Sequence, residues 1–313
     1  MWQPDPAWPS EAGWQPDPAW QRLPGGRSSA GLWLAEAGGR RWVVKRLVAP
    51  LPGDPATLRR PGHLGYWRRE ADVALHAVLA GPGLRSPAVG RVDEDELGVT
   101  VWTEAVEVEQ PPGPFVARAL GRFAGTSLPD APWLCRHLLA DRIALTEAHD
   151  GWPTLGRTTL SDVADVLWRR RRGLLAAYEA LPRGPAHGDA VPANFVGRAG
   201  ADAVAVDWAC LGTAPLGADL GYFSLSARED FDVLHEAYLD GLASVEVAAD
   251  PPAVALAART LAVFTVMSRA EWALARVARG EGALAGKFRH PAVAPHLRAL
   301  QRQFPQIEAL LGM

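Results

Sequence analysis

The spacing of apolar and polar positions changes partway along the chain. From Leu23 onwards the pattern is that of short strands at 32–35, 41–47, 88–93 and 99–106, with one helical stretch, 63–80, between the second and third. The first two strands are separated by Ala37-Gly38-Gly39-Arg40, which is typical of a hairpin turn. This part of the chain is predicted to form a small lobe rich in strands.

After the Pro-rich break Gln110-Pro111-Pro112-Gly113-Pro114, apolar positions recur at helical spacing. The predicted helices cover 115–125, 131–147, 161–181, 228–242, 251–278 and 292–311. A short extended island, 185–208, lies between the third and the fourth of them. We therefore predict an α+β protein with a strand-rich N-lobe at 23–106, a hinge near 105–114 and a larger helical C-lobe at 107–313.

Residues 1–22 are a Pro/Trp-rich extension. The heptapeptide Trp2-Gln3-Pro4-Asp5-Pro6-Ala7-Trp8 recurs as residues 14–20. Its prolines disfavour a regular helix, and two copies are too few for a repeat architecture. The simplest interpretation is a segment whose tryptophans pack on the body of the protein; a binding motif is the alternative.

Composition narrows the class of protein. The net charge of −3 gives no reason to expect nucleic acid or an anionic membrane as the main partner. The longest apolar run, 261–267, is too short to span a bilayer, and the chain does not start like a secretory signal. Two cysteines, Cys135 and Cys210, exclude a disulfide framework, so we expect a cytoplasmic protein.

Lysine is rare in this arginine-rich chain. Among 32 lysines and arginines only Lys45 and Lys287 are lysines. Lys45, on the second predicted strand, is therefore a candidate for a position that needs a compact ammonium rather than a guanidinium, although chance is the alternative.

The extended island carries most of the candidate chemistry. His187-Gly188-Asp189 is followed by Asn194, and a turn at 198–200 leads to a strand that ends in Asp207-Trp208. A hairpin-like loop would bring Asp189, Asn194 and Asp207 together. Oxygen ligands without a cysteine or histidine cluster suit Mg²⁺, which takes one or two carboxylates from protein and its other ligands from phosphates and water.

This series resembles the aminoglycoside phosphotransferase and choline kinase family, relatives of the protein kinases. The family carries H-G-D-x-x-x-x-N, then a strand ending in Asp with Trp or Phe after it, then a further Asp. These positions are His187 to Asn194, Asp207-Trp208 and Asp219 here. Lys45 and Glu70 match upstream, so the resemblance covers about 23–225. It implies a bilobal protein kinase-like fold and phosphoryl transfer from Mg²⁺-bound ATP, or GTP, to a hydroxyl.

The resemblance also implies a role for each matching residue around the reacting groups. Asp189 would be the catalytic base, and Asn194 and Asp207 would hold Mg²⁺. His187 and Asp219 would be structural.

The remaining matches would bind the nucleotide. Lys45 would contact the α- and β-phosphates and pair with Glu70. Ser28 and Ser29 would contribute a loop over the phosphates. The Glu104 carbonyl and the Val106 N–H would hydrogen-bond the base at the hinge.

The acceptor is indicated only weakly. An acidic stretch after Asp219 can receive a polycationic antibiotic or be an ordinary solvated face; its members are Glu229, Asp230, Asp232, Glu236 and Asp240. The prediction is an O-phosphotransferase for an antibiotic or related natural product. The alternatives are a metabolic kinase for a sugar, amino alcohol or nucleoside, and a pseudokinase that only binds nucleotide.

Overall fold

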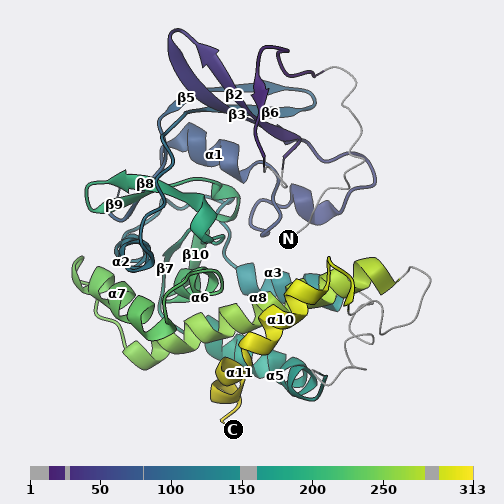
Figure 1. Cartoon of the computed structure of the whole chain (residues 1–313), viewed down its shortest axis with the longest axis vertical. Coiled ribbons are helices and arrows are strands. Elements are labelled where there is room, and N and C mark those ends of the chain that lie inside the picture. Colours follow the sequence, from purple (N-terminus) through teal and green to yellow (C-terminus); the bar gives the residue numbers. More distant parts are fainter. Residues whose placement is uncertain (1–13, 25–28, 80, 149–160, 279–288, 313) are drawn as a thin grey trace.

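The predicted two-lobe α+β architecture is confirmed by a computed structural model, which describes residues 14–24, 29–79, 81–148, 161–278 and 289–312. Figure 1 shows a sheet and the helix α1 in the N-lobe and a helical C-lobe beneath them. Short strands lie where the lobes meet, and the turns between them carry the candidate catalytic residues.

The N-lobe is a five-stranded antiparallel sheet in the order β1-β2-β3-β6-β5. Its strands are β1 (Gln21–Arg22), β2 (Gly31–Ala37), β3 (Arg40–Val48), β5 (Val89–Asp95) and β6 (Gly98–Glu104). Gly38 and Gly39 both have positive φ, 61° and 73°, as a two-residue hairpin turn of matching twist requires. The hairpin expected at this turn is therefore confirmed, and the sheet takes in the last two residues of the predicted extension.

One helix, α1 (Arg69–His76), packs under this sheet after a short 3₁₀ turn, η1 (Ala56–Arg59). The predicted helix over 63–80 is too long at both ends. Before Arg69 the chain forms turns whose carbonyls accept hydrogen bonds from the Arg69 guanidinium instead of from helical N–H groups. At the other end Ala77 adopts a left-handed conformation with φ of 46°, which ends the helix.

The outer face of the sheet is covered by the second copy of the heptapeptide. The Trp14 ring centroid lies 5.3 Å from that of Trp33, and the Trp20 and Trp102 rings meet edge to face at 5.1 Å. The Arg46 guanidinium lies 5.1 Å from the Trp14 ring. The described copy therefore packs on the body of the protein; the first copy lies outside the described residues.

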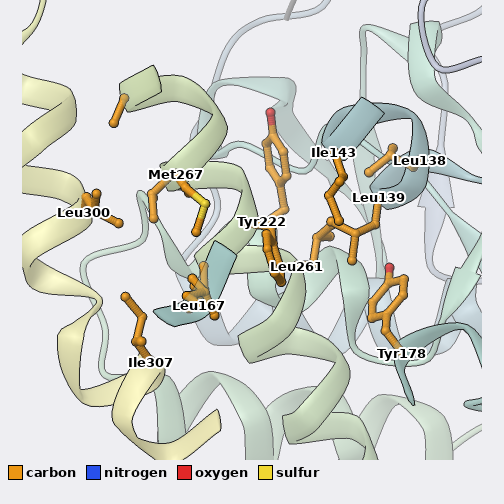
Figure 2. Packing of buried hydrophobic residues seen from close by; sticks show 14 of the residues in the cluster. Leu138, Leu139, Ile143, Leu167, Tyr178, Tyr222, Leu261, Met267, Leu300 and Ile307 are labelled. Carbon is orange, nitrogen blue, oxygen red and sulfur yellow. The ribbon is translucent and has the colours of Figure 1, made fainter. Parts of the chain in front are cut away.

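The C-lobe is built from helices around α8. They are α2 (Gly113–Ala124), α3 (Leu138–Glu147), α5 (Ser161–Glu179), α6 (Ala218–Ser224), α7 (Phe231–Ala243), α8 (Pro251–Ala278), α10 (Ala294–Arg302) and α11 (Phe304–Leu311). Figure 2 shows Leu261 and Met267 of α8 packed with side chains of α3, α5 and α6. Apolar burial between these helices is what stabilises the lobe.

Two predicted helices differ from those observed. The helix expected over 131–147 begins only at Leu138. The backbone of Cys135 pairs with that of Gly212 in an isolated β-bridge, which holds the preceding segment in an extended conformation. The helix expected over 292–311 is divided into α10 and α11. Pro305 has no N–H to continue the hydrogen-bond pattern of α10, so a new helix starts there.

Helix α8 is long enough to be compared with a membrane-spanning helix. By length and composition its residues Pro251–Ala275 could cross a bilayer, although polar residues interrupt its apolar runs. However, 72% of its most apolar window is buried inside the protein. It is therefore the central core helix of the C-lobe.

Small sheets connect the two lobes. β7 (Arg183–Ala186) pairs with β10 (Gly212–Pro215), and β8 (Phe195–Ala199) pairs with β9 (Asp202–Ala205). A strand from the earlier part of the chain, β4 (Leu84–Arg85), joins β9 in parallel. Asp202 fixes this junction, since it accepts hydrogen bonds from the Gly83 N–H at 2.8 Å and from Arg85 Nε at 2.7 Å.

Candidate active site

His187 follows directly after β7 and is fully buried. Its ring lies 4.6 Å from the Trp208 ring, centroid to centroid. Nε2 is 3.0 Å from the Val206 carbonyl and therefore carries the proton, while Nδ1 accepts a hydrogen bond from the Asp189 N–H at 3.3 Å. Because both ring nitrogens are engaged, His187 holds the loop rather than offering a base.

Asp219, at the start of α6, fixes the same loop. Its two oxygens accept the N–H groups of His187 at 2.6 Å and of Gly188 at 2.9 Å. Burial raises the pKa of Asp219, and these hydrogen bonds offset part of that effect. Gly188 has a φ of 78°, and a Cβ there would lie 2.4 Å from the Cys210 carbonyl oxygen. Only glycine fits at this point of the loop.

Asp189 and Asn194 are held together by the turn between them. The Asn194 side-chain nitrogen donates to the Asp189 carbonyl at 2.8 Å and approaches Asp189 Oδ2 at 3.5 Å. Asn194 lies in the short 3₁₀ turn η2 (Pro192–Asn194). Asp189 Oδ1 is buried and has no hydrogen-bond partner within the described residues. This carboxylate oxygen is therefore available to a ligand hydroxyl.

Lys45 lies at the centre of a charged triad that joins the lobes. Its Nζ lies 2.5 Å from Glu70 Oε2, on α1, and 2.8 Å from Asp207 Oδ1. Burial by itself would lower the pKa of Lys45, but the carboxylates of Asp207 and Glu70 raise it above its ordinary value. The pairing of Lys45 with Glu70 that the resemblance implies is formed in the structure.

The same triad sets the charge of its two carboxylates. Burial raises the pKa of Glu70, and Lys45 offsets only part of the effect. Burial also acts to raise the pKa of Asp207, but Lys45 holds it below its ordinary range. Asp207 is thus the more firmly ionised carboxylate of the two.

Asp207 has an unusual backbone conformation, with a φ of 64° just before the 3₁₀ turn η3 (Trp208–Cys210). A non-glycine residue in this region is strained, and such strain is concentrated at functional sites. The strain is maintained by surrounding packing, since Trp208 is buried against Phe123 and His187.

The donor set near Asp207 fits a hard cation held jointly with phosphates. Asn194 uses its nitrogen for hydrogen bonding and Asp207 uses one oxygen for Lys45. Each therefore has a further oxygen without a partner among the described residues, which a cation could take. Across the described ranges, no cluster of three or more His, Cys, Asp or Glu side chains forms a metal site by itself. This arrangement suits Mg²⁺, which takes few ligands from protein.

The segment between the lobes carries the predicted hinge residues. Glu104 ends β6, and its N–H bonds the Ala88 carbonyl. The Val106 N–H makes no hydrogen bond with any residue that the structure describes. Ser29 Oγ bonds the Gly31 carbonyl at 3.3 Å, at the start of β2, whereas Ser28 lies outside the described residues.

Arg69 is a positioning residue that the sequence pattern did not reveal. It is fully buried next to Glu70, and its guanidinium donates to five backbone carbonyls. One of these is Ala209, two residues after Asp207, at 2.5 Å. Arg69 thus connects α1 to the segment that carries Asp207. The sequence shows it only as part of a charged run with Arg68, which is typical of a solvated helix face.

A second missed group lies on the C-lobe side of Asp189. The Tyr222 ring, on α6, is approached by the guanidinium groups of Arg142 of α3 and Arg269 of α8. Arg269 donates to the Tyr222 hydroxyl at 2.8 Å. These three residues are far apart in sequence and belong to no motif, so only the packing of the three helices could reveal them.

Two members of the acidic stretch predicted as a possible acceptor site contact α2. Glu229 accepts the Gly113 N–H at the start of α2, at 3.0 Å. Asp240, on α7, lies 3.9 Å from Arg118 of the same helix. Glu229 therefore caps the start of α2, whereas the exposed pair of Asp240 with Arg118 contributes little to stability.

Comparison with known proteins agrees with this geometry. The sequence model of the phosphotransferase enzyme family matches residues 19–257, so the chain belongs to that family. The resemblance drawn from the motifs is thereby confirmed, and the chain is a phosphotransferase that acts on hydroxyl acceptors. No curated protein matches the chain.

Several solved structures share the fold. A choline/ethanolamine kinase family protein from Mesorhizobium loti is 19% identical, with a TM-score of 0.55 over 97% of this chain and 96% of that one. An aminoglycoside phosphotransferase from Alicyclobacillus acidocaldarius is 17% identical, with a TM-score of 0.56 over the same shares. An amicoumacin kinase in complex with AMP-PNP, Ca²⁺ and its substrate is 13% identical, with a TM-score of 0.56 over 93% and 88%. At these identities the likeness is one of fold.

Proposed function

We propose that this protein is a small-molecule kinase that transfers the γ-phosphoryl group of Mg²⁺-bound ATP, or GTP, to a hydroxyl group, with Asp189 as the base. The observation that carries the proposal is the convergence of Lys45, Glu70 and Asp207, from three separate segments, beside the loop of Asp189 and Asn194. A protein that only bound nucleotide would not need the base, which argues against a pseudokinase.

In the proposed reaction the acceptor oxygen attacks the γ-phosphorus, and the bond from that phosphorus to the β-phosphate oxygen breaks. The hydroxyl proton passes to Asp189, whose Oδ1 has no other partner within the described chain. The products are a phosphate ester and a nucleoside diphosphate. Because the transition state is loose, the residues contribute mainly by positioning and by neutralising charge.

The nucleotide would lie between the lobes. Lys45 would contact the α- and β-phosphates while Glu70 keeps the ammonium in place, and Ser28 and Ser29 would cover the phosphates. At the hinge, the Val106 N–H is free to donate to the base, and the Glu104 carbonyl is proposed as the acceptor.

The free oxygens of Asn194 and Asp207 would hold the cation. When bound, Mg²⁺ would neutralise the charge that develops on the phosphate oxygens. His187 and Asp219 would fix the catalytic loop through the hydrogen bonds that they already make.

For the acceptor we propose an antibiotic or related natural product, modified in the cytoplasm. The solved structures with this fold include kinases named for an aminoglycoside and for amicoumacin, which supports the proposal, and a choline/ethanolamine kinase, which favours the alternative of a metabolic kinase. A metabolic kinase would take a sugar, an amino alcohol or a nucleoside.

Two variants separate chemistry from binding. Asp189→Ala is expected to keep Mg²⁺-dependent nucleotide binding, measured by calorimetry, and to lose phosphorylation of any acceptor found by mass spectrometry. Asp207→Ala is expected to lose the Mg²⁺-dependent binding itself. The control is Glu36→Ala, at an exposed position of β2. Equal turnover in wild type and Asp189→Ala would refute the proposed base, and unchanged Mg²⁺-dependent binding in Asp207→Ala would refute the metal assignment.

A further inference from the structure

Beside the proposed base, the C-lobe presents two arginines on a buried tyrosine. The Cζ atoms of Arg142 and Arg269 lie 5.3 and 5.0 Å from the centroid of the Tyr222 ring. In Figure 2 the Tyr222 hydroxyl points away from the apolar side chains of Leu261 and Leu167. The polar end of Tyr222 therefore faces out of the hydrophobic core, toward the arginines.

This group lies close to the catalytic loop, because Asp219, three residues before Tyr222 on α6, accepts the N–H groups of His187 and Gly188. Burial raises the pKa of Tyr222 to about 12; Arg142 and Arg269 oppose this rise, and the Asp189 carboxylate adds to it. One hydroxyl is thus within reach of two cations and of the proposed base. An acceptor whose hydroxyl contacts Asp189 would have the arginines as near neighbours.

Arg142 is the most informative of these residues because no described carboxylate forms an ion pair with it. It is only 6% exposed, and its buried Nε has no hydrogen-bond partner among the described residues. Its guanidinium makes no hydrogen bond with any residue that the structure describes and lies next to the Tyr222 ring. A buried, unpaired cation is costly, so this position is better suited to a bound ligand than to stabilising the fold.

The charges around the site favour an anion over a cation. Glu271, on the same helix as Arg269, lies two residues further on and so points about 200° away around the helix axis. It is fully buried and already has a partner. Of the acidic stretch, Glu229 and Asp240 contact α2 rather than this group.

We propose that Arg142 and Arg269 form the acceptor subsite and that the acceptor carries an oxyanion, a carboxylate or a phosphate, close to the hydroxyl that is phosphorylated. A guanidinium presents paired N–H donors that match either oxyanion. The oxyanion would supply the partner that Arg142 lacks and would orient the hydroxyl toward Asp189. This inference rests on the proposed kinase function and narrows the natural-product class to acidic compounds.

The first test needs no substrate. Arg142→Met replaces a buried charge that has no ion-pair partner among the described residues with a shorter apolar side chain, so the melting temperature of the ligand-free protein is expected to rise by about 2 °C or more. Arg118→Met, at an exposed position of α2, is the control and is expected to change it little. A fall in melting temperature for Arg142→Met would overturn the proposal, because Arg142 would then be stabilising the fold.

The second test uses inorganic phosphate as the probe, with the nucleotide site saturated by Mg²⁺ and AMP-PNP. Phosphate is expected to raise the melting temperature of wild type and of Arg118→Met, and not that of Arg142→Met or Arg269→Met. Equal shifts in all four proteins, or none in wild type, would overturn the subsite.

The third test compares gluconate, glucose 6-phosphate, glucose and glucosamine as acceptors at equal concentrations. Phosphorylation of either anionic compound in preference to the other two is expected, and the preferred one distinguishes carboxylate from phosphate. For that acceptor, Arg142→Met should raise KM about 10-fold or more while KM for ATP is unchanged. Preference for glucose or glucosamine would overturn the proposal. A protein that binds no Mg²⁺-nucleotide would instead refute the kinase function, and the melting of Arg142→Met without ligand would still test the subsite.

Discussion

Replacing Arg69 with methionine tests whether this side chain holds α1 against the segment that carries Asp207. Arg69 is fully buried, and its guanidinium donates to the carbonyls of five residues. Methionine ends at about the position of Nε and has no donor, so the substitution leaves these carbonyls without their partner. Because one of them belongs to Ala209, the segment of Asp207 should lose its connection to α1.

The magnitude follows from the hydrogen bonds that are lost. A bond from a charged donor contributes about 1.5–3 kcal/mol, and a buried carbonyl left unsatisfied costs about 1–3 kcal/mol. These values are not additive, since water reaches some of the carbonyls and removal of a buried charge relieves its desolvation. Breaking a buried charged network typically costs about 3–5 kcal/mol, and we expect Arg69→Met to fall in that range.

Urea unfolding followed by circular dichroism measures this cost. With a slope of about 3 kcal/mol per molar urea, the midpoint should fall by about 1–1.7 M. The matched control is the neighbouring Arg68→Met, which removes ion pairs with Glu94 and Asp72 at a partly exposed site. Such pairs contribute about 0–1 kcal/mol. Similar midpoints for the two variants would refute the reasoning, as would full kinase turnover in Arg69→Met.

Three further predictions concern single sites. Gly188→Ala places a Cβ 2.4 Å from the Cys210 carbonyl oxygen, at a residue whose φ is positive. It should lower the melting temperature far more than Gly200→Ala, because Gly200 also has a positive φ but no described atom near its Cβ position. Equal effects of the two substitutions would contradict the steric argument. Trp14→Ala removes ring contacts on the outer face of the sheet and should lower the free energy of unfolding, measured with urea, by about 1–2 kcal/mol. An unchanged free energy would show that the second heptapeptide does not stabilise the sheet. Burial opposes ionisation of Asp202, but its hydrogen bond from Arg85 and its other partners hold its pKa below the ordinary 3.8. A lowered carboxyl pKa stabilises the fold above pH 3.8 and loses this effect as the pH falls below it, so Asp202→Asn should be less stable than wild type at pH 7 and closer to it at pH 3; a constant difference would exclude the linkage.

Sequence by itself determined the class of protein and indicated the candidate residues of the site. The two-glycine turn between two apolar runs predicted the hairpin around Gly38, and the resemblance of the segment from His187 to Asp207 to the phosphotransferase family indicated the proposed catalytic loop. These features depend on local backbone geometry and on motifs whose members are close in the chain, so they are readable from the residues alone.

The tertiary structure decided what depends on contacts between distant segments. Helix α1 is shorter at both ends than predicted, and the last predicted helix is two helices, α10 and α11. Arg69 is buried, whereas its sequence context suggested a solvated residue. The tertiary structure also brought Arg142 and Arg269, more than a hundred residues apart in sequence, next to the same tyrosine ring. A side chain's environment is set by whichever elements pack against it, and a single sequence records the side chain but not those neighbours.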